Sequence, residues 1–182
     1  MEELSLHILD LVENSLTAGA KLIKVEIEED HQKDLLTLKV DDDGRGMSPE
    51  MAAKAADPFV TTRTTRRVGL GLSLLKANAR ACEGDLALSS IQGRSTTVEA
   101  RLKLSHLDRQ PLGDWPRTLT GLILTHPEVD FFYRHRVGGD EFELDTRELK
   151  NELGKEALRD PQALKLIQGQ VAAALLQLGS AA

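Results

Sequence analysis

Residues 41–46 read Asp-Asp-Asp-Gly-Arg-Gly, which places Asp42, Gly44 and Gly46 at alternate positions. The stretch follows alternating apolar residues at 36–40, a pattern that predicts a half-buried strand. On its own the motif is equally consistent with an ordinary turn, because aspartate and glycine are good turn formers. Two further motifs, one before it and one after it, favour a functional interpretation.

The first of these motifs lies in an amphipathic helix predicted near the start of the chain. Apolar residues recur at helical spacing from Leu4 to Leu16, and Gly19 is placed to end the helix. Asp10 and Asn14 are one turn apart, so they project from one face, where a carboxylate and an amide oxygen can hold Mg²⁺ or a water. A solvated helix face is the alternative interpretation of the same pair.

The second motif, Gly69-x-Gly71-Leu72, opens another predicted helix. A glycine turn at a helix N-terminus offers backbone donors and partial positive charge, which favour a polyphosphate. The preceding residues 57–68 are rich in threonine and arginine and lack periodicity, so we expect a surface loop. Arg63 in this loop could reach the phosphates, or it could be part of a solvated basic loop.

Together these motifs resemble those of the GHKL superfamily, named after gyrase, Hsp90, histidine kinases and MutL. Residues 11–20 are similar to the asparagine-box helix of MutL-type ATPases, and residues 69–73 to the second glycine box of histidine kinases. Residues 40–47 resemble the first glycine box. The weaker matches are the phenylalanine box at Pro58-Phe59 and the terminal G-T-x-F strand at residues 93–98. In the family order, the resemblance covers about residues 4–104.

The resemblance implies an α+β fold, a two-layer α/β sandwich of the Bergerat type with a mixed sheet and helices on one face. Residues 1–104 would be the ATP-binding domain. Residues 105–118 contain two prolines, a glycine and the only tryptophan, and indicate a linker. Residues 119–182 would form a small α+β C-terminal domain. Its predicted elements are short strands at 122–125, 129–136 and 141–144 and helices beginning near Thr146 and Asp160.

The same resemblance implies what each site residue binds. Asn14 should coordinate Mg²⁺ that bridges the ATP phosphates. Asp42 should accept a hydrogen bond from the adenine amino group, which excludes guanine because its keto oxygen would face the carboxylate without a donor. Thr96 should complete the adenine pocket. The other ATP-binding residues implied are Gly44, Gly46, Arg63, Gly69, Leu70, Gly71 and Leu72.

The chain also departs from the superfamily pattern. Asp10 stands where hydrolytic members carry a glutamate that acts as general base, and its shorter side chain predicts slow turnover or none. Arg67 and Ser95 replace glycines of the second and third boxes, which affects the expected lid conformation. No histidine precedes an acidic residue in a long dimerisation helix, so a complete histidine kinase is not expected, and His7 is predicted to lie at the helix surface.

Composition restricts the partners. The 182 residues carry a net charge of -6, with a pI near 5.4, which argues against nucleic-acid binding through a basic surface. The single cysteine, Cys82, excludes an internal disulfide. The longest apolar run, residues 171–176, is too short to span a bilayer. The N-terminal segment lacks a signal-peptide pattern, so a cytoplasmic protein without membrane contact is expected.

Three functions remain open at this point. The first is a Mg-ATP-binding, histidine kinase-like module with a regulatory or signalling role, acting on a separate partner protein. The second is a switch operated by ATP and ADP, with slow hydrolysis. Residues 145–149 contribute to a resemblance between the whole chain and short ATP-binding proteins that accompany iron-only hydrogenase subunits, so a redox complex is a candidate partner. The third is a pure interaction protein with a degenerate pocket, and the oligomeric state stays open.

Overall fold

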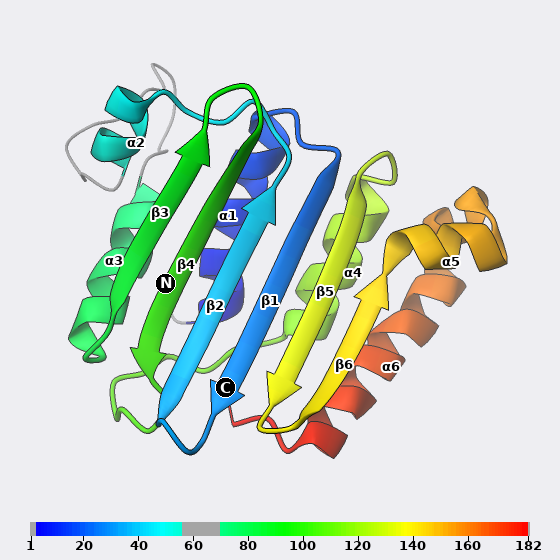
Figure 1. Ribbon diagram of the computed structural model, residues 1–182. Helices are drawn as coiled ribbons and strands as arrows, with labels where there is room; N and C mark the ends of the chain where they lie inside the picture. Colours follow the sequence, from blue (N-terminus) through cyan, green and yellow to red (C-terminus); the bar gives the residue numbers. More distant parts are fainter. Residues whose placement is uncertain (1–2, 56–69, 182) are drawn as a thin grey trace.

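The computed structural model describes residues 3–55 and 70–181 as one six-stranded sheet covered by helices (Figure 1). The helices are α1 (Leu4–Thr17), α2 (Pro49–Ala55), α3 (Leu70–Ala81), α4 (Trp115–Thr125), α5 (Thr146–Leu153), the 3-10 helix η1 (Lys155–Arg159) and α6 (Pro161–Leu178). The strands are β1 (Leu22–Asp30), β2 (Leu35–Asp42), β3 (Asp85–Ile91), β4 (Ser95–Lys103), β5 (Asp130–Val137) and β6 (Asp140–Asp145).

The sheet is mixed, with the strand order β3-β4-β2-β1-β5-β6. β1 pairs parallel with β5, and every other neighbouring pair of strands is antiparallel. The register places Asp42, the last residue of β2, directly opposite Thr96 on β4. This pairing brings together two of the residues to which the sequence assigns the adenine pocket.

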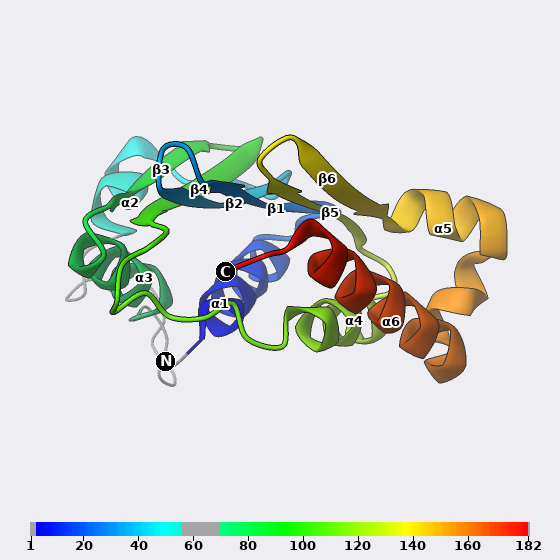
Figure 2. The same ribbon diagram turned by 90° about the horizontal axis from the view of Figure 1, so that it is seen from below.

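Helices α1, α3, α4 and α6 all pack on the same side of the sheet, as Figure 2 shows. Alternate strand residues such as Ile23, Val25 and Ile27 point toward this layer, where they are at most 2% exposed. Leu4 and Ile8 of α1 meet them from the helix side and are equally buried. Burying each such side chain stabilises the fold by about 1.5–3 kcal/mol, so α1 is held firmly against the sheet. The predicted two-layer α/β sandwich is confirmed.

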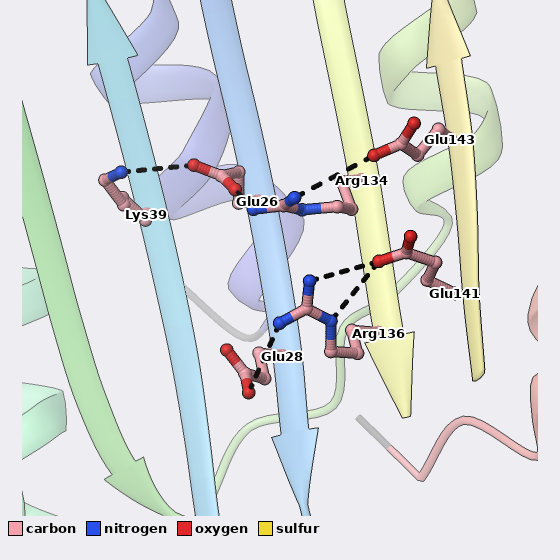
Figure 3. A network of polar contacts seen from close by, with 7 residues as sticks. All are labelled: Glu26, Glu28, Lys39, Arg134, Arg136, Glu141 and Glu143. Carbon is pink, nitrogen blue, oxygen red and sulfur yellow. Dashed lines mark hydrogen bonds and ion pairs between the residues drawn. The ribbon is translucent and has the colours of Figure 1, made fainter. Parts of the chain in front are cut away.

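The other side of the sheet carries a ladder of alternating charges across β2, β1, β5 and β6 (Figure 3). Glu26 lies between Lys39, 3.1 Å away, and Arg134, which also reaches Glu143 at 3.8 Å. Arg136 links Glu141 at 3.1 Å with Glu28 at 3.9 Å, and these side chains keep between 18% and 49% of their accessible surface. Ion pairs this exposed contribute about 0–1 kcal/mol each to the stability of the fold. They are therefore typical of a sheet face that is exposed to water.

One predicted element is wrong. Residues 122–125, expected as a short strand, form the end of helix α4. This helix starts inside the predicted linker, because the Asp114 side chain accepts a hydrogen bond from the Arg117 amide and Pro116 occupies the first turn. The apolar residues Leu119, Leu122 and Ile123 then follow helical spacing into the core.

The remaining elements after residue 128 form as predicted, with β5 and β6 joined by a turn at Gly138 and followed by α5 and α6. β5 and β6 extend the same sheet rather than forming a second one. The division into two domains at residues 105–118 therefore stays a prediction about folding units. None of the helices in the described ranges is long and apolar enough to cross a membrane.

Candidate functional site

Three consecutive aspartates at the end of β2 make three different sets of contacts. Asp41 points to the open face of the sheet and accepts a hydrogen bond from the Thr97 hydroxyl. Asp43 is exposed, and its Oδ1 accepts from the backbone amides of Lys21 at 2.7 Å and Leu22 at 2.9 Å. Only Asp42 points into the helix-covered side, where it is 6% exposed. Asp42 is thus the buried carboxylate of the three, while Asp41 and Asp43 make hydrogen bonds to neighbouring strands and turns.

The Asp42 carboxylate is held on both oxygens by neutral donors. The Ser15 hydroxyl of α1 donates to Oδ2 at 2.7 Å, and the Gly44 amide donates to Oδ1 at 2.9 Å. An ionised carboxylate offers about four lone-pair sites, so each oxygen can accept a further donor. The side chain is therefore fixed in orientation but keeps hydrogen-bonding capacity for a ligand.

Thr96 faces Asp42 across β2 and β4, and its hydroxyl belongs to a short chain of contacts. The Ser90 hydroxyl donates to the Ser95 carbonyl oxygen at 3.0 Å and accepts from the Met47 amide at 2.8 Å. The Thr96 hydroxyl lies 3.0 Å from the Ser90 hydroxyl, and either oxygen can be the donor. In both arrangements the Thr96 oxygen keeps a lone pair that can accept a hydrogen bond beside Asp42.

Asp10 on helix α1 lies against Gly71, which belongs to the glycine motif that opens α3. A Cβ atom added to Gly71, in the first turn of α3, would lie 2.7 Å from Asp10 Oδ2 and 2.8 Å from Asp10 Cβ. Glycine is therefore required at this position for α3 to approach α1. Asn14, one turn after Asp10 on the same helix, is exposed. The structure places Asp10 beside the start of α3, and phosphate binding at this point stays a prediction.

His7 was predicted at the surface, and this expectation is wrong. Its side chain is 2% exposed, and its Nε2 lies 3.0 Å from Gln110 Oε1. The segment before α4 runs across the start of α1 and covers the ring, a contact between residues far apart in the chain. Burial lowers the pKa of His7, and burial also raises the pKa of the half-buried Asp10 carboxyl one turn later.

Gly44 and Gly46, in the loop after β2, let this loop pack closely against neighbouring parts of the protein. Gly46 has φ +59°, and a Cβ there would lie 2.1 Å from the Ile91 carbonyl oxygen. At Gly44 an added Cβ would lie 2.8 Å from Asp42 Oδ1 and 2.9 Å from the Ala18 Cβ. Both positions are thus restricted to glycine by the protein itself, and their predicted place beneath a base stays a prediction.

Several predicted residues cannot be placed. Arg63 and Gly69 lie outside the described residues, as do Pro58, Phe59 and Arg67. Leu70 begins α3 and Leu72 is buried in the core beneath it, at 8% exposure. Ser15 and Ser90 were not singled out from the sequence, because small hydroxyl residues carry no periodic signal. The only signal for Ser15 was its place on the buried face of the predicted helix, next to the exposed Asn14.

Comparison with protein families gives a match to the model described as histidine kinase-, DNA gyrase B- and HSP90-like ATPase. It covers residues 2–106 of the 182, more than half of the chain. The matched region contains α1, the three aspartates and the paired strands β2 and β4. It ends before α4.

Two curated bacterial proteins resemble the same region. The sensor protein kinase FleS of Pseudomonas aeruginosa is 41% identical over 97 residues, covering 53% of this chain and 24% of FleS. The non-motile and phage-resistance protein of Caulobacter vibrioides is 32% identical over 117 residues, covering 59% of this chain and 14% of that protein. The chain thus spans about a quarter or less of the length of these relatives.

Two solved structures share the fold. The N-terminal domain of a DNA repair protein superimposes with a TM-score of 0.58 at 15% identity, covering 80% of this chain and 53% of that one. The MutL ATPase domain of Aquifex aeolicus, complexed with ADP, gives a TM-score of 0.51 at 23% identity, with 85% and 68% coverage. At these identities the likeness is one of fold.

The raised pKa of Asp10 predicts a pH-dependent gain in stability for Asp10→Asn. A carboxyl whose folded pKa lies above its unfolded value favours the protonated folded state, so the native chain loses stability as pH rises from about 4, the ordinary aspartate pKa. The penalty is complete once the pH exceeds the raised folded pKa of Asp10. We expect Asp10→Asn to raise the melting temperature at pH 7 and to have little effect near pH 3.5. Glu13→Gln, exposed on the same helix, is the control, and an equal gain in both variants would contradict the prediction.

The contact between Ser15 and Asp42 predicts a stability defect for Ser15→Ala. The substitution leaves Asp42 Oδ2 without its protein donor, which costs about 1–3 kcal/mol in the free energy of unfolding at neutral pH. Urea unfolding measures this loss. In a double-mutant cycle the loss should largely disappear when Asp42 is already replaced by alanine, which cannot accept a hydrogen bond from Ser15. Additive effects would show that the two side chains do not interact.

Proposed function

The chain belongs to the histidine kinase-, DNA gyrase B- and HSP90-like ATPase family, and on this basis we propose that it binds ATP with Mg²⁺ beside the end of β2. The observation that carries the proposal is the buried Asp42 carboxylate, held by Ser15 and Gly44 with acceptor capacity left over. A buried carboxylate is costly unless it is well paired, so its retention here favours a ligand that supplies further donors.

The adenine amino group supplies such a donor. In this proposal it donates to Asp42, and Thr96, which keeps an acceptor lone pair next to Asp42, contacts a ring nitrogen through a water. Guanine is rejected because its keto oxygen would face the carboxylate with no proton between them. Gly44 and Gly46, which the fold itself restricts to glycine, keep the loop clear of the base.

The phosphates are proposed to lie between α1 and the first turn of α3. Gly71, packed against Asp10, offers its amide at a helix N-terminus, where backbone donors and the helix dipole favour anions. Arg63, Gly69, Leu70 and Leu72 complete this side of the proposed site. Arg63 and Gly69 enter it from the family motif alone.

The donor set of α1 suits Mg²⁺. Asn14 offers an exposed amide oxygen, a hard ligand of the kind that Mg²⁺ prefers, and Asp10, one turn earlier on the same helix face, offers a carboxylate that can hold a water. Across the described ranges, no group of three or more histidine, cysteine or acidic residues could hold a metal by itself. The ion would therefore draw its other ligands from phosphate and water. Bound there, Mg²⁺ would neutralise phosphate charge.

For the use of ATP we propose a kinase-type regulatory module that acts on a separate partner protein in the cytoplasm. FleS of Pseudomonas aeruginosa is named a sensor protein kinase and DivJ of Caulobacter vibrioides a histidine protein kinase, which supports a signalling role. The alternative is a switch driven by ATP and ADP with slow hydrolysis, for which a redox complex remains a proposed partner. Burial raises the pKa of Asp10 toward neutral pH, which suits a general base. The short side chain of Asp10 nevertheless limits the rate of ATP hydrolysis.

Calorimetric titration with ATP and Mg²⁺ tests the proposed binding. We expect the native chain to bind ATP and Asp42→Asn to bind it about 10- to 100-fold more weakly, because a hydrogen bond to a charged acceptor is worth about 1.5–3 kcal/mol. Asp41→Asn is the matched control, since Asp41 contacts Thr97 on the opposite face of the sheet. No heat with the native chain, or equal affinities in all three proteins, would refute the proposal.

Phosphate transfer distinguishes the kinase from the switch. With ATP labelled on its γ-phosphate, the kinase version predicts that label appears on a co-purifying protein and is reduced in Asp42→Asn. The switch version predicts release of labelled phosphate at a slow rate that Asp10→Ala abolishes and Glu13→Gln preserves. If candidate partners stay unlabelled and phosphate release survives in Asp10→Ala, neither version holds.

A further inference from the structure

The segment after α6 folds back onto a buried carboxylate near the end of strand β1. α6 ends at Gly179, which has φ +67° and turns the chain. Glu29 of β1 is 0% exposed, and its Oε1 accepts from the Ser180 hydroxyl at 2.5 Å, while its Oε2 accepts from the Ala181 amide at 2.8 Å. Both oxygens of the Glu29 side chain thus hold the segment through hydrogen bonds.

Glu29 is held from the other side by β5. His135, also 0% exposed, places its Nε2 2.8 Å from Glu29 Oε1, and its Nδ1 lies 2.8 Å from the Tyr133 hydroxyl. Tyr133 packs on Trp115, the only tryptophan, with ring centroids 5.4 Å apart. A buried carboxylate depends on all of its donors, so loss of the Ser180 and Ala181 donors would open the site to water. Trp115 lies close enough to report such a change.

The same segment is gripped by Arg109, in the stretch that crosses the start of α1. Arg109 donates from Nη2 to the Ala181 carbonyl oxygen and from Nε to the Leu104 carbonyl oxygen, both at 2.6 Å. The next residue, Gln110, contacts His7 inside α1. The position of residue 181 is therefore tied directly to the stretch that packs on α1.

That stretch also caps α1. The amides of Leu4 and Ser5 donate to the carbonyl oxygens of Pro111 and Leu112, each at 2.9 Å. The first amides of a helix lack partners within the helix, and the residue before α1 makes no side-chain cap. Residues 109–112 thus replace the missing cap and fix the start of the helix that carries Asp10, Asn14 and Ser15.

We propose that residues 179–181 are a latch: docked on Glu29, they hold residues 109–112 against α1, so latch docking and nucleotide binding on α1 strengthen each other. The proposal rests on the nucleotide site proposed above. The latch buries no large apolar side chain and is held by a few hydrogen bonds, which is typical of segments that open locally. A free latch leaves α1 less ordered, and ATP must then pay the ordering cost on binding.

Ser180→Asp tests the latch, because a second carboxylate beside buried Glu29 expels the segment without touching α1 or residues 109–112. Gln170→Asp, exposed on α6, adds the same charge elsewhere and is the control. Relative to the control, Ser180→Asp should speed hydrogen exchange of the Ala181 amide, change Trp115 fluorescence and weaken ATP binding about three- to tenfold, at the modest end of measured couplings. Arg109→Ala should act in the same direction on all three.

Reciprocity gives a second readout on the native chain: saturating ATP should slow exchange of the Ala181 amide by the factor that the latch adds to ATP affinity. The proposal is overturned if Ser180→Asp frees the Ala181 amide but binds ATP as tightly as Gln170→Asp does. It is also overturned if Ser180→Asp leaves Ala181 exchange unchanged. Absence of ATP binding in the native chain would instead refute the nucleotide site, while exchange and fluorescence would still report whether Glu29 holds the latch.

Discussion

The hydrogen bond from Ser15 to Asp42 is the contact on which the site depends, because it joins the helix layer to the end of the central strand. It needs β2 to end with Asp42 on the covered side of the sheet and α1 to lie across that end. The amide of Gly44 then holds the second carboxylate oxygen. A buried charge without these donors would be costly, so strand register, helix position and loop conformation support one another.

The part of the chain beyond residue 104 is in direct contact with the elements that form the proposed site. β5 pairs with β1, so the charge ladder on the open face and the buried Glu29–His135 contact both cross from one part to the other. Residues 109–112 cap α1 on the covered side. Any signal received by the C-terminal elements therefore has a physical connection to the helix that carries Asn14, the proposed magnesium ligand.

The sequence predicted much of this arrangement, and its failures have clear physical causes. The alternation of apolar and polar residues along β1 and β2, and the apolar face of α1, were strong enough signals to predict the fold. The three motifs then led to Asp42 and Gly71. Residues 122–125 were misassigned because a short apolar run does not distinguish a strand from a helix end. Burial of His7 depends on Gln110, more than a hundred residues later, and Ser90 is recruited only through strand register; neither leaves a local signal.

The central claim is that Asp42 recognises the amino group of adenine. The most direct test compares the affinity of the native chain for ATP and for purine riboside triphosphate, which differs from ATP only by lacking that amino group. We expect the native chain to bind the analogue about 10- to 100-fold more weakly than ATP, and Asp42→Asn to bind the two ligands with similar affinities. Equal affinity of the native chain for both nucleotides would contradict it.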